Sequence, residues 1–448
     1  MTLLDPLFAS DAIDKIFADP ARVQRMLDFE ASLARAEASA SVIPSSAVSP
    51  ITSQCRVDRF DLDSLAMTAV KSGNLAIPMV KQLTELVSTQ DADAARYVHW
   101  GATSQDVIDT GLVLQLRDAF DVIANDLERL SNQLAQLASK HHGTVLPART
   151  WMQHAVPTVF GLKAAGWLDA MNRHRIRLQE VRRRSLVLQF GGAAGTLASL
   201  RERGLEVSKA LASELQLELP ALPWHTHRDR LAEVATCLAL LTGTLGKMAR
   251  DISLQSQTEV SELFEPADEG RGGSSTMPHK RNPVACAVVL AAAERVPALA
   301  SIMLTAMSQE HERGLGNWHA EWETLPELVR TSAGALHRML EMITGLEVDV
   351  DRMRLNIEMT CGLIFSEAVS KALAKSIGKA AAHEHIEAAS RKALAEKKHL
   401  REVLAGDASV TAHLSKAQLE KLFDPAGYTG AAAQFIDRVL AESKSGNP

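Results

Sequence analysis

The sequence has little that would build a disulfide scaffold, a metal site or a β-rich fold. Only four of its 448 residues are cysteines (Cys55, Cys237, Cys286 and Cys361). They lack the spacing of metal ligands, so we expect reduced thiols in a cytoplasmic protein. Aromatic residues make up 4% of the chain, whereas alanine is plentiful, which favours closely packed helices. No stretch alternates apolar and polar residues long enough to predict a strand. The predicted fold is all-α.

The chain also lacks a basic excess, a signal peptide and a membrane-length apolar run. A net charge of -6 and a pI near 6.2 give no overall basic field, so no nucleic-acid partner is expected. The N-terminus carries Asp5 and no basic segment before an apolar run, unlike a secretory signal. The apolar run over residues 284–293 is cut by Glu294, Arg295 and Pro297 before it could span a bilayer. We therefore expect a soluble protein without a membrane partner.

Apolar spacing predicts a bundle of long helices. A helix is expected from Asp19-Pro20 to about Ser41. Two longer seams have steps of three and four: Val113, Leu116, Phe120, Ile123, Leu127, Leu130, Leu134 and Leu137, then Leu231, Val234, Leu238, Leu241, Leu245, Met248 and Ile252. Further apolar residues beside these seams favour a multi-helix bundle over a dimeric coiled coil. The expected domains are an N-terminal helical domain (1–104), a central long-helix bundle (105–349) and a more charged C-terminal helical domain (350–448).

The segment from Gly270 to Pro283 combines features of a ligand-binding loop. Three of its first four residues are glycines, the composition of a loop that closes over a ligand. Ser274 and Lys280 follow, and Asn282-Pro283 is typical of a helix N-cap followed by proline at the first helical position. Hydroxyl groups and a cation at a helix N-terminus suit binding and protonation of an anion. A plain surface linker is the alternative.

This segment resembles the fumarase/aspartase superfamily. The motif Gly-Ser-Ser-x-Met-Pro-x-Lys-x-Asn-Pro is present in full from Gly273 to Pro283. The resemblance implies that Ser274 is catalytic, that Lys280 holds a substrate carboxylate and that Asn282 lies at the substrate. It also implies a homotetramer, joined through the long helices, whose active sites are shared between three subunits. No metal ion or other cofactor is expected.

Three further segments are candidates for substrate binding. His99 precedes Thr103 and Ser104 at the start of the first long helix, where backbone N–H groups and hydroxyls could bind an anion or simply cap the helix. The resemblance implies that the Thr-Ser pair binds a carboxylate and that the histidine assists. Arg149 and Arg313 have the fork geometry that suits carboxylates. Gln153 lies close to Arg149 in the sequence.

Trp151 decides between reactions. The superfamily usually has Arg-Thr-His here, and that histidine protonates the leaving group, whereas this chain has Arg149-Thr150-Trp151. An indole is no acid near neutral pH, so the leaving group must be stable as an anion. A carboxylate, with a conjugate-acid pKa of about 4, meets that condition. We therefore interpret Trp151 as a wall of the active site, with a core position as the alternative.

The expected reaction is thus an intramolecular addition of a carboxylate across a double bond, which forms a lactone. The resemblance implies a cycloisomerase that acts on a small tricarboxylate, a carboxymuconate from aromatic-acid breakdown. An adenylosuccinate lyase-like elimination and a non-catalytic relative remain alternatives. The acids and histidines of residues 309–319 do not have the spacing of a zinc site. The glycines at 191–195 resemble half of a dinucleotide-binding fingerprint, but they follow a helical stretch and not a strand. We expect the glycines to form a bend between helices.

Overall fold

The computed structural model describes residues 3–266, 272–273, 277 and 280–444. The chain divides into two compact units, each packed mainly against itself. Unit 1 comprises Met1–Asp126, Arg175–Gly246 and Val288–Arg338. Unit 2 comprises Leu127–His174, Lys247–Ala287 and Met339–Pro448. The boundaries of these two units differ from those of the three domains expected from the sequence. The division into three domains stays a prediction.

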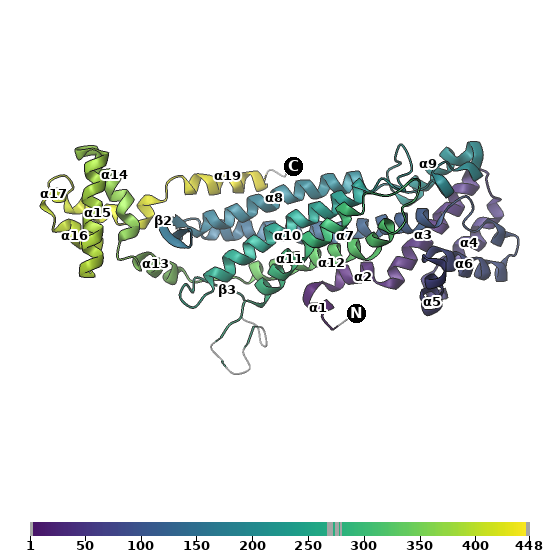
Figure 1. Cartoon of the computed structure of the whole chain (residues 1–448), viewed down its shortest axis with the longest axis horizontal. Helices are drawn as coiled ribbons and strands as arrows, with labels where there is room; N and C mark the ends of the chain where they lie inside the picture. The colour runs from purple at the N-terminus through teal and green to yellow at the C-terminus, as the bar shows by residue number, and fades with distance from the viewer. Residues whose placement is uncertain (1–2, 267–271, 274–276, 278–279, 445–448) are drawn as a thin grey trace. The chain divides into compact units, whose positions relative to one another are not determined.

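The described residues are mostly helical (Figure 1). The short N-terminal helices and α9 lie wholly in unit 1: α1 (Asp5–Phe8), α2 (Asp11–Phe17), α3 (Asp19–Ser39), α4 (Val48–Gln54), α5 (Leu62–Ser72), α6 (Ala76–Gln90) and α9 (Gly204–Leu215). Five long helices have residues in both units: α7 (Ser104–Lys140), α8 (Phe160–Ser185), α10 (Asp229–Gln255), α11 (Val284–Thr305) and α12 (Asn317–Thr344). The rest lie in unit 2: α13 (Val350–Glu358), α14 (Ser366–Ile377), α15 (Lys379–Glu396), α16 (Leu400–Ala405), α17 (Ala408–Thr411), α18 (Lys416–Leu422) and α19 (Ala432–Lys444).

Both apolar seams form buried faces of long helices, as predicted. The first lies in α7, where seven of its eight members are at most 1% exposed and Leu137 is 9% exposed. The second lies in α10, where no member exceeds 3%. Small residues let the helices approach closely in unit 1, since a Cβ on Gly246 of α10 would lie 2.5 Å from that of Ala293 on α11. Burial of these faces is the main stabilising contribution to the bundle.

The helix predicted over residues 19–41 is α3, which ends at Ser39. Its N-cap is Ala18, whose side chain makes no capping hydrogen bond, and Asp19 and Pro20 are the first helical residues. Asp19 still complements the helix dipole, and proline is tolerated in the first turn. The same helix buries two carboxylic acids, Glu30 at 1% exposure and Glu37 at 0%.

The C-terminal part of unit 2 has its own apolar core. Buried side chains from α14, α15, α16 and α18 meet there, among them Leu373, Ile386, Leu400 and Leu419, together with Phe365 directly before α14. Phe365 also packs edge-on against Phe423, with ring centroids 5.3 Å apart. These helices follow one another along the chain (Figure 1). Their short connections suit neighbouring antiparallel helices.

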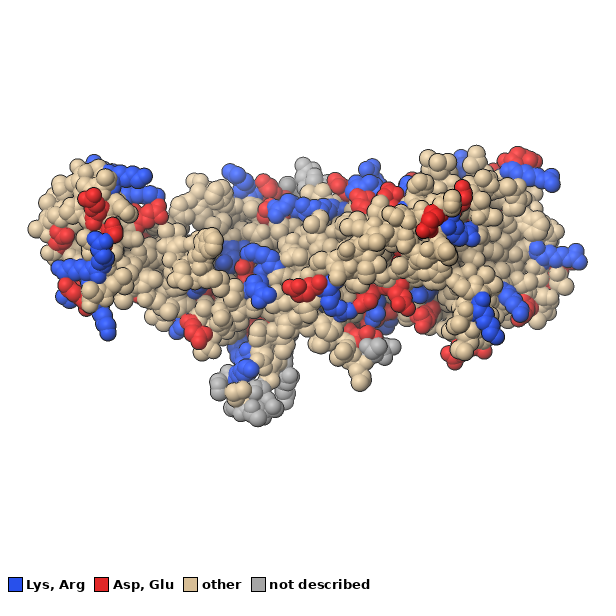
Figure 2. Space-filling model, in the orientation of Figure 1, with Lys and Arg blue, Asp and Glu red and all other residues tan. Residues whose placement is uncertain are grey.

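The described residues also contain two short strand pairs that the sequence pattern did not predict. In unit 2, β1 (Val145–Thr150) pairs antiparallel with β2 (Gln153–Val159), and β3 (Leu263–Phe264) pairs with β4 (Glu347–Val348). The β1–β2 hairpin escaped the pattern search because each strand contains a proline, which weakens strand propensity. Basic and acidic side chains are interspersed on the face drawn in Figure 2.

Candidate active site

The predicted site residues fall into two groups. His99, Thr103, Ser104 and Arg313 belong to unit 1, and Arg149, Trp151, Gln153, Lys280 and Asn282 belong to unit 2. Ser274 lies outside the described residues. Each group is described by itself.

The structure brings Arg313 and Thr103 together in unit 1. Arg313 Nη2 donates to Thr103 Oγ1 at 3.0 Å and to the Ala193 carbonyl oxygen at 3.2 Å. Arg313 Nε is buried and has no partner among the described residues. Thr103 directly precedes Ser104, the first residue of α7. A guanidinium with a free N–H beside a helix N-terminus is suited to an anion such as a carboxylate.

Asp106 ties the loops around Thr103 together. Its carboxylate is fully buried and accepts from five groups: Thr103 N (3.1 Å), Gln189 Nε2 (3.0 Å), Gly191 N (3.0 Å), Gly192 N (2.9 Å) and His225 Nε2 (2.9 Å). The two glycines lie in the connection between α8 and α9, so the predicted bend is confirmed. A Cβ on Gly191 would lie 2.7 Å from Pro223 Cβ and 2.9 Å from His225 Cε1, so only glycine fits there.

His99 is paired with a carboxylate that the sequence did not indicate. Its Nδ1 lies 2.6 Å from Glu30 Oε1, and only 16% of the imidazole is exposed. Burial lowers the pKa of His99, but the charge and hydrogen bond of Glu30 and the charge of Asp106 raise it, and the net direction is upward. The imidazolium form is therefore favoured.

A second buried ion network supports the segment that carries Arg313. The guanidinium of Arg228 contacts both carboxylates of a buried pair, Asp109 (2.6 and 3.1 Å) and Glu321 (two contacts of 3.0 Å). Gln309 Nε2 and Trp318 Nε1 complete the network at 3.0 and 3.1 Å. Residues 309 and 318 flank Arg313 in the sequence, so this network fixes both ends of its loop. The segment that carries Arg228 is itself partly buried, with Trp224 at 2% exposure and His225 at 4%.

In unit 2, Trp151 and Met152 form the turn of the β1–β2 hairpin. Both have positive φ, 50° and 65°, as in a two-residue hairpin turn whose twist matches the strands. Trp151 is 98% exposed and Met152 71% exposed. The alternative of a core tryptophan is therefore wrong for this chain. Gln153 is also exposed and pairs with Thr150 in the ladder.

Arg149 anchors the base of this turn. Its two Nη atoms donate to Glu262 at 2.9 and 2.6 Å, and Glu262 is fully buried. Asn356 Nδ2 adds a 2.8 Å bond to the same carboxylate. His154, opposite Arg149 in the ladder, has a lowered pKa because of burial and then the Arg149 charge. Both Nη atoms of Arg149 are thus paired with a buried carboxylate in this chain.

Lys280 and Asn282 lie before α11. Lys280 is exposed, and Asn282 N donates to the Gly272 carbonyl oxygen at 2.9 Å. Glu265 accepts from the backbone of Ala285 (3.0 Å) and Cys286 (2.8 Å) in the first turn of α11. We expected Asn282 to cap this helix, but the side chain that caps these N–H groups is Glu265. This acid is distant in the sequence, and its carboxylate is stabilised there by the unpaired N–H groups of the first turn and by the helix dipole.

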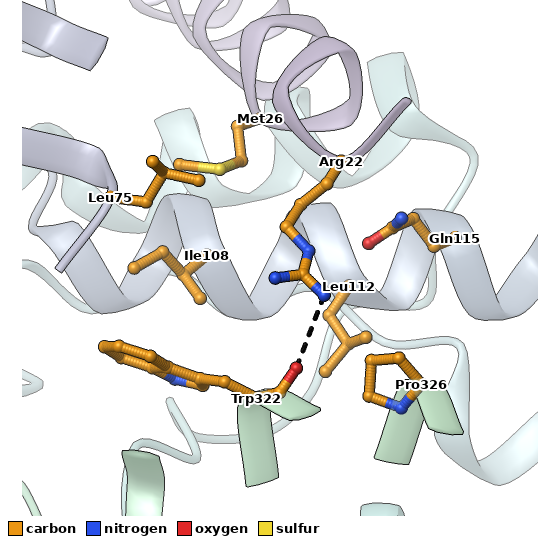
Figure 3. Close-up of a pocket in the computed structure, with 8 residues that line it drawn as sticks. All are labelled: Arg22, Met26, Leu75, Ile108, Leu112, Gln115, Trp322 and Pro326. Carbon is orange, nitrogen blue, oxygen red and sulfur yellow. Dashed lines mark hydrogen bonds between the residues drawn. The ribbon is translucent and has the colours of Figure 1, made fainter. Parts of the chain in front are cut away.

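A cavity of about 60 Å³ in unit 1 is a poor candidate for the site (Figure 3). Its lining is mainly apolar, and Arg22 Nη2 donates to the Trp322 carbonyl oxygen at 3.4 Å. None of the predicted site residues lines it. Among the residues that the structure describes, no group of three His, Cys, Asp or Glu side chains is arranged to hold a metal ion.

Comparison with known proteins places this geometry in a family. The "Lyase" family matches residues 8–298, and "Adenylosuccinate lyase C-terminus" matches residues 362–439. The chain belongs to the fumarase/aspartase superfamily. It is 56% identical over 438 residues to the 3-carboxy-cis,cis-muconate cycloisomerase of Bradyrhizobium diazoefficiens, which covers 98% of this chain and 97% of that protein. It is 54% identical over 440 residues to the enzyme of that name from Pseudomonas aeruginosa, which covers 98% and 96%.

A solved superfamily structure agrees with the fold. The 3-carboxy-cis,cis-muconate lactonizing enzyme of Pseudomonas putida superposes with a TM-score of 0.96 at 51% identity and covers 99% of both chains. The family and fold predictions are therefore confirmed. Among the helices of the described residues, two are long and apolar enough to cross a membrane by length and composition, α10 with a mean hydropathy of 1.3 and α11 with 1.7. Of the most apolar window of each helix, 61% is buried within the chain in α10 and 33% in α11.

Proposed function

We infer that the chain catalyses the cycloisomerisation of 3-carboxy-cis,cis-muconate to 4-carboxymuconolactone, an intramolecular lactonisation in aromatic-acid catabolism by the β-ketoadipate pathway. The observation that carries this conclusion is its identity of more than 50%, over nearly all of its length, with cycloisomerases of that substrate. The activity predicted from the sequence is confirmed. Disappearance of 3-carboxy-cis,cis-muconate in an ultraviolet assay tests it directly, beside an adenylosuccinate cleavage assay that should give no turnover.

Trp151 fits this reaction chemically. When a substrate carboxylate adds to the diene, no leaving amine or hydroxide needs a proton in either direction. An indole at the tip of a rigid hairpin instead offers a flat apolar surface to the folded diene and excludes water. Its 98% exposure leaves this surface free in the described chain.

The unit 1 group is our proposed binding site for substrate carboxylates. Arg313 supplies charge and an unpaired buried N–H, Thr103 and Ser104 supply hydroxyls at the start of α7, and His99 supplies an imidazolium. Arg149 was expected to bind a carboxylate as well. Because Glu262 occupies both of its Nη atoms, we assign it the task of holding the hairpin that presents Trp151 and Gln153.

Ser274 is our proposed proton donor to the carbon beside one carboxylate, and Lys280 our proposed charge partner of the aci-carboxylate that forms there. Asn282 completes this group. The support is the intact superfamily motif from Gly273 to Pro283. Ser274→Ala should lower kcat by roughly two to four orders of magnitude, the usual range for a positioned proton transfer, without changing assembly. Activity within about tenfold of the parent would exclude Ser274 as the donor.

We also propose a cytoplasmic homotetramer whose active sites are shared between subunits. The support is α11, in which only 33% of the most apolar window is buried within this chain. Val284, Ile302 and Leu304 on this helix are 38%, 43% and 50% exposed. Such an apolar face is typical of a subunit interface. Light scattering should give about four times the 48.5 kDa chain mass, and an active monomer would contradict the proposal.

A further inference from the structure

His99 is held in a conformation that needs support. Its φ of 58° lies in the left-handed region, which residues other than glycine rarely adopt. Strain of this kind persists only where the surroundings hold the residue. The contact that holds the side chain is the 2.6 Å approach of Nδ1 to Glu30 Oε1, at the short end of charge-assisted hydrogen bonds. Glu30 itself is 1% exposed.

We propose that Glu30 is a positioning residue that keeps His99 as an imidazolium, so that its Nε2–H can donate to a substrate carboxylate. This inference rests on the proposed function, which places His99 at the substrate. A neutral imidazole that donates Nδ1–H to Glu30 would have a lone pair at Nε2 and would repel a carboxylate. The doubly protonated ring donates at both nitrogens. The structure shows no partner for Nε2 among the described residues.

The charges around His99 favour the cation. Glu30 faces it from α3, and Asp106 contributes a second negative charge from α7. Both raise the pKa of His99 against the effect of burial. Glu37, two turns further along α3, adds no charge near neutral pH because burial raises its pKa to about 9. A trianionic substrate would gain from this cation in addition to Arg313.

The test measures KM and kcat for 3-carboxy-cis,cis-muconate from pH 6 to pH 9, where the substrate carboxylates stay ionised. In the parent, KM should be constant at low pH and rise where His99 loses its proton. Glu30→Gln should move that rise to lower pH, because the charge and hydrogen bond that raise the pKa of His99 are lost, so that KM at pH 7.5 increases several-fold while kcat changes by less than about threefold. Glu30→Asp, which keeps a carboxylate at this position, should bring the rise in KM part of the way back to the parent's pH.

Two variants separate the possible failures. Glu37→Gln is the matched control, a buried acid on the same helix that does not contact His99, and it should keep the parent's KM profile. His99→Gln should raise KM and remove its pH dependence, and it decides the question if Glu30→Gln does not assemble. If Glu30→Gln keeps the parent's profile while His99→Gln raises KM, the role of Glu30 is refuted and the proposed site stands. If His99→Gln leaves KM unchanged, the placement of His99 at the substrate is refuted, and with it this inference.

Discussion

Glu37 is a buried acid whose replacement should change how stability depends on pH. The side chain is fully buried in α3, and neither carboxylate oxygen has a hydrogen-bond partner among the described residues. Burial and then the charge of Glu30 raise its pKa to about 9. The folded protein therefore carries Glu37 as a neutral acid at pH 7, whereas the unfolded chain ionises it. Glu37→Gln removes this titration with almost no change in shape.

The size of the effect follows from proton linkage. Between the ordinary carboxyl pKa of 4.5 and the folded value of about 9, the folded state binds one proton more than the unfolded state. The free energy of unfolding of the parent then falls as pH rises, by about 1.4 kcal/mol per unit. From pH 6 to pH 8, both inside this window, the parent should lose about 2.7 kcal/mol through this group. The free energy of unfolding of Glu37→Gln should not show this decrease.

Equilibrium urea unfolding at pH 6 and pH 8, at one fixed protein concentration, measures the difference. The variant's stability relative to the parent should rise from pH 6 to pH 8 by up to the calculated amount. Asp28→Asn is a suitable control, because Asp28 is partly exposed on the same helix and pairs with Arg25 at 2.8 Å. It should show no such trend. A stability difference between Glu37→Gln and the parent that is equal at both pH values would show that Glu37 is ionised in the folded protein, and the reasoning would fail.

Three further changes test other parts of the structure. Trp151→His should leave folding intact, because the side chain is 98% exposed, but should lower lactonisation about 10- to 100-fold in the ultraviolet assay; faster turnover would contradict the reaction assignment. Arg228→Met should destabilise unit 1 by about 3–5 kcal/mol in urea, because Asp109 and Glu321 remain buried without their cation. Glu262→Gln should lower kcat and thermal stability together, because Arg149 loses its partner at the hairpin base; unchanged kinetics would show that this anchor is dispensable.

The long helices could be predicted from the sequence because apolar periodicity is a local signal. Every member of the seam from Val113 to Leu137 lies in α7, and none exceeds 9% exposure. The hairpin could not be predicted in this way. Its strands are six and seven residues long, and Pro147 and Pro157 face each other in the register. The hairpin is specified by a turn with two positive φ values and by one long-range ion pair. Neither feature produces a periodic pattern of apolar residues in the sequence.

The residues that hold the site in place were missed for a related reason. Glu30 lies 69 residues from His99, and Glu262 lies 113 residues from Arg149. Neither acid belongs to a motif. In the sequence, each is one carboxylate among 54 acidic residues. Only the fold shows that both are buried and that each faces a cation, whereas the motif residues themselves were recognisable from their chemical types.

The buried acids also explain how a chain of net charge -6 can bind a trianion. In unit 1 these acids have partners inside the chain or are neutral: Asp106 accepts from five donors, Asp109 and Glu321 share Arg228, Glu30 pairs with His99, and Glu37 is neutral. Arg313 contacts a hydroxyl and a carbonyl oxygen instead, so its charge is not balanced by a carboxylate. The cation that contacts Thr103 is therefore Arg313, and its charge does not depend on the net charge of the chain. A cation without a carboxylate partner can thus remain at the proposed carboxylate site of an acidic chain.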